Sequence, residues 1–212
     1  MFEGKSIIEI LNMGGVTLYI LLFCSILSVT IICYKIFEFW SKSRVSRVEF
    51  IKKLTKYVEE GKLNEAIDYC ESVNSPMASV SKVGIIAFKA KGEIISENAM
   101  DREIMIQTVN LETFTTILAT LGSMTVYIGL FGTVLGIISA FHDISAVGAG
   151  GITVIIGGVS EALMATAAGL SVAVPASAAY NFIAKRIDKF VIQMEYCVSA
   201  LEEVLFKRGV SK

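Results

Sequence analysis

The side chain with the most distinctive chemistry in this sequence is a single carboxylate inside a long apolar segment. Glu161 is the only charged residue from Ile152 to Ala184, and no lysine or arginine lies between Arg102 and Lys185. An unpaired carboxylate is costly in hydrocarbon, so such a group usually faces a bundle interior, a cavity or an ion path. Glu161 is therefore a candidate for proton or ion chemistry. The alternative is a protonated or hydrogen-bonded glutamate that only supports helix packing.

The composition of the chain is that of an integral membrane protein. Hydrophobic residues make up 54% of the 212 residues and charged residues only 18%, which is more apolar than soluble domains of this size. The 19 basic and 20 acidic residues nearly cancel, so the chain lacks the overall basicity of a nucleic-acid-binding protein. We therefore expect contacts with membrane lipid and none with nucleic acid.

Three stretches are long and apolar enough to cross a bilayer, which takes about 20 residues in a helix. They predict an all-α protein with transmembrane helices at residues 16–37, 113–141 and 152–184. Residues 142–151 contain three glycines and are expected to form the outer turn, which makes the last two helices an antiparallel hairpin. The rest of the chain divides into an outer-surface amphipathic segment at 1–15, a cytoplasmic helical segment at 38–112 and a cytoplasmic C-terminal helix at 185–212.

The positions of the basic residues predict the orientation of these helices. Only Lys5 precedes the first span, whereas seven basic residues follow it between positions 35 and 56, and the predicted turn at 142–151 has none. Three more basic residues follow the third span at positions 185, 186 and 189. Basic flanks remain in the cytoplasm, so we expect the N-terminus and the turn outside and the C-terminus inside.

The segment between the first two spans is expected to be a small helical unit rather than an enzyme domain. Amphipathic periodicity predicts helices near 45–59, 63–72 and 77–90 and a further one from about 95, with a break at 74–76. The expected core residues of this unit are Leu54, Tyr57, Leu63, Ile67 and Tyr69. Four aromatic residues, Tyr34, Phe37, Phe39 and Trp40, fit an interfacial belt, although core packing also accounts for some of them.

Other kinds of chemistry are not indicated. The four cysteines, Cys24, Cys33, Cys70 and Cys197, are scattered without CxxC spacing, so they are expected to be buried, reduced thiols rather than disulfide or zinc ligands. His142 stands beside Asp143 in the predicted turn, where a solvated pair is favoured over a metal site or a catalytic dyad. The glycines lack the pattern of a phosphate-binding loop. We expect no catalytic site, no cofactor and no metal.

Small residues at helical spacing mark both helices of the predicted hairpin. They are Gly129, Gly132 and Gly136 in the second span and Gly158, Ala162 and Gly169 in the third. Small residues let helix backbones approach closely, and one hairpin has more of this surface than it can cover by itself, so we expect a homo-oligomer. Pro175 removes one backbone hydrogen bond and is expected to bend the third helix.

Two long motifs in the hairpin resemble a known family. The segment GLFGTVLGI at 129–137, followed by Ala140-Phe141, resembles the GLLGTVxGI…AF signature of the MotA/TolQ/ExbB proton-channel family. The segment EALMATAAGL at 161–170, continuing through 173–175 to Tyr180-Asn181, resembles that family's EALxATAxGLxxAIPxxxxYN helix. The resemblance covers the whole predicted topology, with three spans and a cytoplasmic segment between the first and the second.

The resemblance implies an assembly, a partner and a location. Family members like this chain form a homopentamer in the bacterial inner membrane, around a pore that holds the single helix of an ExbD- or TolR-like partner. An aspartate of that partner carries the proton, and proton flow powers a TonB- or TolA-like protein. An ExbB-like role in TonB-dependent transport is favoured over a TolQ-like role in envelope maintenance, and a four-span MotA type is less favoured. The alternative function of a different kind is a structural scaffold or a passive channel that moves no protons.

The resemblance also assigns the proton-pathway roles to Thr133, Thr166 and Glu161. Thr133 lies nine residues before His142 and Glu161 nine after Ile152, which predicts a similar depth of about 13 Å for both, with Thr166 about 8 Å deeper. Hydroxyls at two levels could bond a protonated carboxyl or a water. The alternative for each threonine is a hydroxyl bonded to its own helix backbone.

Glu161 and Thr166 are not expected to face the same way. At about 100° per residue they lie about 140° apart around their helix, so they cannot both point at a pore axis. Thr166 shares a ridge with Ala162 and Gly169. We expect this ridge to face the moving partner and Glu161 to lie nearer a subunit boundary.

Overall fold

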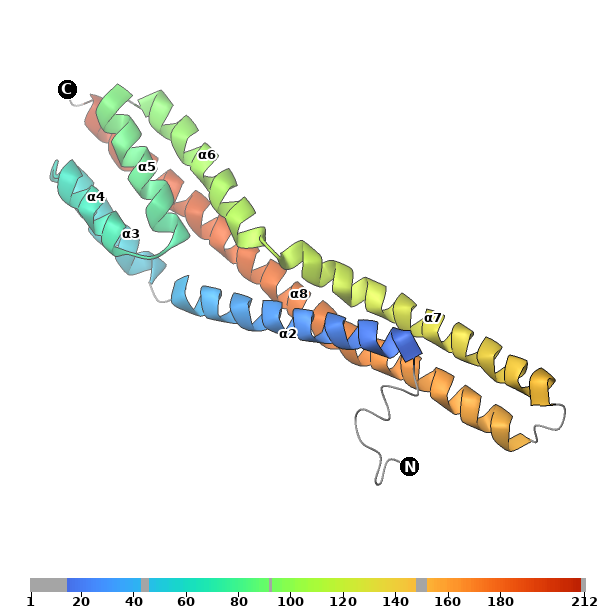
Figure 1. The fold of residues 1–212 in the computed structure, drawn as a ribbon. Helices are drawn as coiled ribbons and strands as arrows, with labels where there is room; N and C mark the ends of the chain where they lie inside the picture. The colour runs from blue at the N-terminus through green and yellow to red at the C-terminus, as the bar shows by residue number, and fades with distance from the viewer. Residues whose placement is uncertain (1–14, 43–45, 92, 148–151, 211–212) are drawn as a thin grey trace. The chain divides into compact units, whose positions relative to one another are not determined.

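A computed structural model describes residues 15–42, 46–91, 93–147 and 152–210, and the elements in these ranges are helices (Figure 1). They are α2 (Gly15–Lys42), α3 (Arg47–Glu59), α4 (Leu63–Ser72), α5 (Pro76–Lys91), α6 (Glu93–Glu112), α7 (Thr115–Val147) and α8 (Ile152–Val210). Three candidate membrane spans, at Gly15–Lys42, Ser96–His142 and Ile156–Lys207, are long and apolar enough to cross a bilayer. The predicted class, an all-helical multi-pass membrane protein, is confirmed. The amphipathic segment expected at 1–15 falls almost entirely outside the described residues.

The chain divides into two compact units. Unit 1 comprises residues 1–33 and 114–182, and unit 2 comprises residues 34–113 and 183–212. Unit 1 therefore holds most of α2, all of α7 and the first half of α8, which carry the family-like motifs. Unit 2 holds helices α3 to α6, the end of α2 and the second half of α8.

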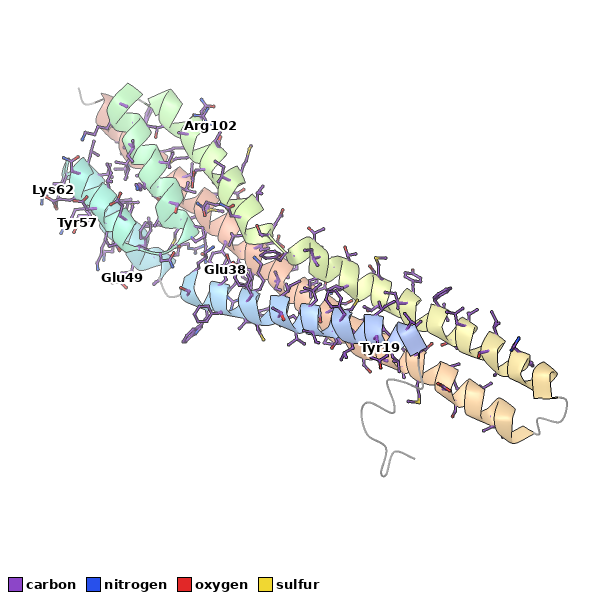
Figure 2. All side chains as sticks on the ribbon, in the orientation of Figure 1. Tyr19, Glu38, Glu49, Tyr57, Lys62 and Arg102 are labelled. Atoms are coloured by element: carbon purple, nitrogen blue, oxygen red, sulfur yellow. The ribbon has the colours of Figure 1, made fainter. Side chains whose placement is uncertain are left out.

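Unit 2 is built around a buried apolar core. Helix α3 presents Phe50, Leu54 and Val58 to this core at helical spacing, and α8 contributes Met194 and Leu201. The five core residues predicted from the sequence are confirmed. Leu54 is fully buried in this core, and four residues are partly buried against it, namely Tyr57, Leu63, Ile67 and Tyr69. Glu49, Tyr57 and Lys62 lie on the α3–α4 part of this unit (Figure 2).

A buried lysine closes the end of α6 inside unit 2. Phe114 has a positive φ of 64°, so α6 stops at Glu112 and its last carbonyls have no helical partners. Lys35, whose side chain is 0% exposed, donates from Nζ to the Leu111 carbonyl at 2.9 Å and to Glu38 at 2.8 Å. The sequence analysis used Lys35 only as an orientation signal. The structure makes it a cap for a helix far away in the sequence.

The four aromatic residues of the expected belt and the four cysteines each divide between buried and exposed positions. Phe39 is buried and packs on Phe190, with ring centroids 5.7 Å apart, whereas Tyr34, Phe37 and Trp40 are exposed. Three of the cysteines are buried as predicted, but the prediction was wrong for Cys33, which is exposed. Cys33 lies on the outward face of α2, where a small apolar thiol suits lipid as well as a protein core.

Unit 1 is a hairpin of α7 and α8 with α2 packed beside it (Figure 1). Helix α7 continues to Val147, so the predicted turn at 142–151 is too long: residues 142–147, His142 included, are helical, and 148–151 lie outside the described residues. Residues 142–147 include neither glycine nor proline, so no strong helix breaker occurs before the glycines begin. Helix α8 then runs without a break from Ile152 through Pro175 to Val210.

Candidate functional site

The centre of the hairpin is a place where the backbones of α7 and α8 touch. A Cβ atom added to Gly129 would lie 2.8 Å from the Ala165 carbonyl oxygen, 3.1 Å from Gly169 Cα and 3.2 Å from Thr166 Cα. All three atoms belong to the backbone of α8, so no side chain fits at position 129. The carbonyl of Gly129 is thereby brought within reach of side chains on the other helix.

Two threonine hydroxyls occupy this place. Thr133 Oγ1 lies 3.2 Å from the Gly129 carbonyl of its own helix and 3.1 Å from the Ala162 carbonyl of α8. Thr166 Oγ1 lies 3.3 Å from the same Gly129 carbonyl, across the hairpin, and the two hydroxyls hydrogen-bond each other. Thr133 and Thr166 therefore form one polar group between the helices rather than two separate ones.

Each of these hydroxyl protons has more than one acceptor within hydrogen-bonding distance. Each hydroxyl carries one proton and two lone pairs, and the pair has three contacts to two carbonyl oxygens as well as the contact between the hydroxyls. A rotation of either hydroxyl redirects its proton without moving the backbone. Both threonines are half-buried, so a group outside the chain can reach them. The pair can accept a hydrogen bond from a protonated carboxyl or a water and donate another one.

The structure corrects the depths predicted for these residues. Thr133 lies fourteen residues before Val147, the end of α7, and Thr166 lies fourteen residues after Ile152, the start of α8, so the two threonines are level. The prediction that Thr133 is level with Glu161 was wrong. It counted from His142, which lies five residues before the end of the helix.

Glu161 is not part of the threonine pair. It lies five residues before Thr166, about 7.5 Å nearer the α7–α8 connection along the helix. Gly158 faces Ala140 of α7, and at about 100° per residue Glu161 lies about 60° to one side of Gly158 and Thr166 about 80° to the other. Glu161 is half-buried and forms no ion pair with the residues that the structure describes.

The small-residue ridge of α8 has a different use from the one predicted. Added Cβ atoms at Gly132 and Gly136 would lie 2.8 Å from Ala165 Cβ and 2.8 Å from Ala162 Cβ, and Ala162 is 2% exposed. The ridge through Ala162 and Gly169 thus faces α7 of the same chain, and its assignment to a moving partner was wrong. An antiparallel hairpin brings its own two small faces together first, because they are already linked.

Within the ranges that the structure describes, no three histidine, cysteine or acidic side chains lie close enough to hold a metal ion. The candidate site is therefore two hydroxyls and two backbone carbonyls between apolar helices, with one carboxylate a turn and a half away. The carbonyls and hydroxyls can orient hydrogen bonds, and the carboxylate can take up a proton. Together they define a multi-pass membrane protein with a polar pair at the centre of its helical hairpin.

Residues 72–196 of the chain match the MotA/TolQ/ExbB proton channel family. The match extends over more than half of the chain and includes all of α7 with the Thr133–Thr166 pair. The chain belongs to this family, as its two hairpin motifs predicted. Membership in a family of channel proteins also agrees with the expectation that the chain is not an enzyme.

Curated relatives carry two different names. The chain is 33% identical over 134 residues to biopolymer transport protein ExbB of Neisseria gonorrhoeae, covering 57% of this chain and 61% of that protein. It is 42% identical over 107 residues to Tol-Pal system protein TolQ of Haemophilus influenzae, covering 50% of this chain and 44% of the relative. A third match, 38% over 95 residues, is ExbB of Pseudomonas putida, with 45% and 29% covered. The chain thus spans about three fifths or less of these relatives.

Proposed function

We propose that this chain is the ring subunit of a proton-driven motor of the bacterial inner membrane. In this proposal five copies surround the single membrane helix of an ExbD-like partner, and the assembly energises a TonB-like protein for outer-membrane transport. The N-terminus is periplasmic and the C-terminus cytoplasmic, in agreement with the basic residues that flank the spans. Thr133, Thr166 and Glu161 are the proton-pathway residues.

The observation that supports this proposal most directly is the paired hydroxyls of Thr133 and Thr166. A threonine in a membrane helix can satisfy its hydroxyl on its own backbone, four residues earlier. Thr133 has that contact but also reaches across to Ala162, and the hydroxyl contacts of Thr166 go to α7. Two hydroxyls that satisfy each other between helices are a chemical group that a proton-carrying aspartate can use as it passes.

The test removes the hydroxyls and keeps the side-chain shape. We expect Thr133→Val and Thr166→Val to abolish partner-dependent transport in cells while the amount of assembled ring stays unchanged. Proton flux into liposomes containing the ring and its partner measures the same loss directly. Full transport in the double variant would show that both threonines serve helix packing only, and the proposed proton-driven function would lose its main support.

The ring itself needs a separate test. Extracted in mild detergents, the chain is expected to give a homopentamer in native mass spectrometry. The small residues of α7 and α8 do not support the expected pentamer, because they pack against each other within one chain. Exposed apolar side chains on α7, such as Phe131, Ile138 and Phe141, and membership in the family support it instead. Monomers and dimers alone in several detergents would contradict it.

A TolQ-like role in envelope maintenance is the second candidate, because the chain is also 42% identical over 107 residues to the TolQ of Haemophilus influenzae. Complementation separates the two roles. Cells that lack their own ExbB regain TonB-dependent uptake if the first role holds, and cells that lack TolQ regain detergent resistance if the second one does. A scaffold that conducts no protons would restore neither activity and would show no flux in liposomes.

A further inference from the structure

Tyr127 is an exposed tyrosine in the middle of a membrane helix. It is 69% exposed and stands at the midpoint of the uncharged segment between residues 113 and 141. Tyrosines of membrane proteins usually lie at the interfaces, where the hydroxyl meets water. A phenol at this depth needs a polar partner, because an unsatisfied hydroxyl in hydrocarbon is unfavourable.

The described residues of the chain do not satisfy this phenol. Thr120 and Ser123, also on α7, satisfy their hydroxyls on carbonyls of their own helix. A tyrosine ring holds its hydroxyl too far from its own backbone for such a bond. Within the described part of the chain, Tyr127 has no hydrogen bond. A partner from another molecule would satisfy the hydroxyl that the described residues leave without a hydrogen bond.

The direction of Tyr127 shows where that partner lies. Gly136 faces Ala162 of α8, and Tyr127 precedes Gly136 by nine residues, about half a turn around α7. Tyr127 consequently points away from α8, at the outer edge of the hairpin. It also lies about 120° around α7 from Thr133, so it is not a third member of the threonine pair.

The opposite edge of the hairpin offers a matching position at the same depth. Gly129 and Gly169 face each other, so Tyr127, two residues before Gly129, is level with Ser171, two residues after Gly169. Ser171 is exposed and lies about 200° around α8 from Gly169, so it points away from α7. Its hydroxyl donates to the Ala167 carbonyl at 2.8 Å, which leaves its oxygen free to accept.

We propose that Tyr127 of one copy packs on Ser171 of the next copy and donates its phenolic hydrogen bond to the Ser171 hydroxyl. Copies in a ring around the membrane normal all lie at one depth, so residues level within a chain are also level between chains. The contact joins two different edges, which is the head-to-tail arrangement that closes a ring. Ala167, exposed one turn before Ser171 on α8, leaves room for the aromatic ring on that side.

This inference rests on the proposed ring but concerns which surfaces form it. The test uses single cysteines at positions 127 and 171 in a Cys33→Ser background, since Cys33 is exposed. Tyr127→Cys and Ser171→Cys are placed on two differently tagged copies, and membranes are treated with a short bifunctional thiol reagent. We expect a shift from the 23.0 kDa monomer to a dimer that carries both tags.

The matched control moves one cysteine to another depth on the same helix. Leu163 is 58% exposed and lies eight residues before Ser171, about 12 Å away along α8. Tyr127→Cys paired with Leu163→Cys should therefore give no dimer. A control pair that links as well as the test pair, or a test pair that does not link, would overturn the inference.

Function and interface can fail separately in this experiment. If native mass spectrometry gives a pentamer and the liposomes conduct protons, but positions 127 and 171 do not link, only the proposed contact is wrong. If Tyr127→Phe leaves the ring as resistant to detergent dissociation as the unchanged chain, the proposed phenolic hydrogen bond is wrong, whether or not positions 127 and 171 link. A chain that stays monomeric in mild detergent contradicts the proposed function itself.

Discussion

Replacing Gly129 by alanine should damage the threonine pair without touching either threonine. The added Cβ would lie 2.8 Å from the Ala165 carbonyl oxygen, whereas ordinary contact begins at 3.4 Å. The obstructing atom is backbone, so α7 and α8 must separate locally by about 0.6 Å. A rigid separation of this size stretches the Thr133 contact to Ala162 from 3.1 Å to about 3.7 Å and the Thr166 contact to Gly129 from 3.3 Å to about 3.9 Å. Hydrogen bonds of that length are lost.

The energetic cost of Gly129→Ala is the difference between two effects. Crowding a close-packed contact costs about 1–3 kcal/mol, while alanine in place of a helical glycine gains about 1 kcal/mol of helix propensity. The net change in the free energy of unfolding is therefore expected to be about 2 kcal/mol or less. A modest loss of stability should accompany a large loss of partner-dependent transport.

Gly157→Ala is the matched control for this substitution. Gly157 lies in α8, the other helix of the hairpin, but a Cβ there has no atom within 4 Å, so alanine adds only the gain in helix propensity. Transport in cells, the amount of assembled ring and its thermal midpoint in mild detergent should be measured for both variants. If Gly129→Ala transports as well as Gly157→Ala, the close approach of the two backbones is not what positions the hydroxyls.

Three further predictions concern single side chains. Glu161→Gln should assemble a normal ring yet lose transport, because glutamine keeps the size of the side chain but cannot ionise. Unchanged transport would leave Glu161 with a packing role only. Lys35→Met should lower the free energy of unfolding by about 1.5–3 kcal/mol, since the Leu111 carbonyl loses a charged donor. Lys42→Met should lower it by at most about 1 kcal/mol, and thermal unfolding that ranks the two variants in the reverse order would contradict the capping role of Lys35. Burial raises the pKa of the Cys70 thiol to about 12, so only about one molecule in ten thousand is a thiolate at pH 8; Cys70 should resist thiol reagents until the chain unfolds, and rapid labelling of the folded protein would show that this part of unit 2 opens.

The helices and their core could be predicted because each depends on local pattern. Residues 63–72 were predicted as a helix with these limits, and α4 has them, since Gly61 precedes it and the break at 74–76 follows it. Leu54 and Tyr57 were assigned to the core from spacing alone, and both pack there. Periodicity of 3.6 residues records which side of a helix is buried, and it needs no knowledge of the partner.

The register of the hairpin could not be predicted from the same pattern. It depends on where α7 ends, and the segment from His142 to Val147 contains residues that suit a helix or a turn. An error of five residues in that end moved Thr133 away from the level of Thr166. The burial of Lys35 was also hidden, because its acceptor at Leu111 is 76 residues away in the sequence.

The close packing of the hairpin and its polar chemistry are one feature. Small residues bring the α7 and α8 backbones into contact, and only that contact places the Gly129 carbonyl within reach of the Thr166 hydroxyl. A hairpin with larger residues at these positions would separate the two helices and leave each threonine bonded to its own backbone. The glycines therefore matter to proton chemistry because of the distance they set. Substitutions at the glycines and at the threonines should consequently impair the same step, although only the threonines carry the hydroxyls.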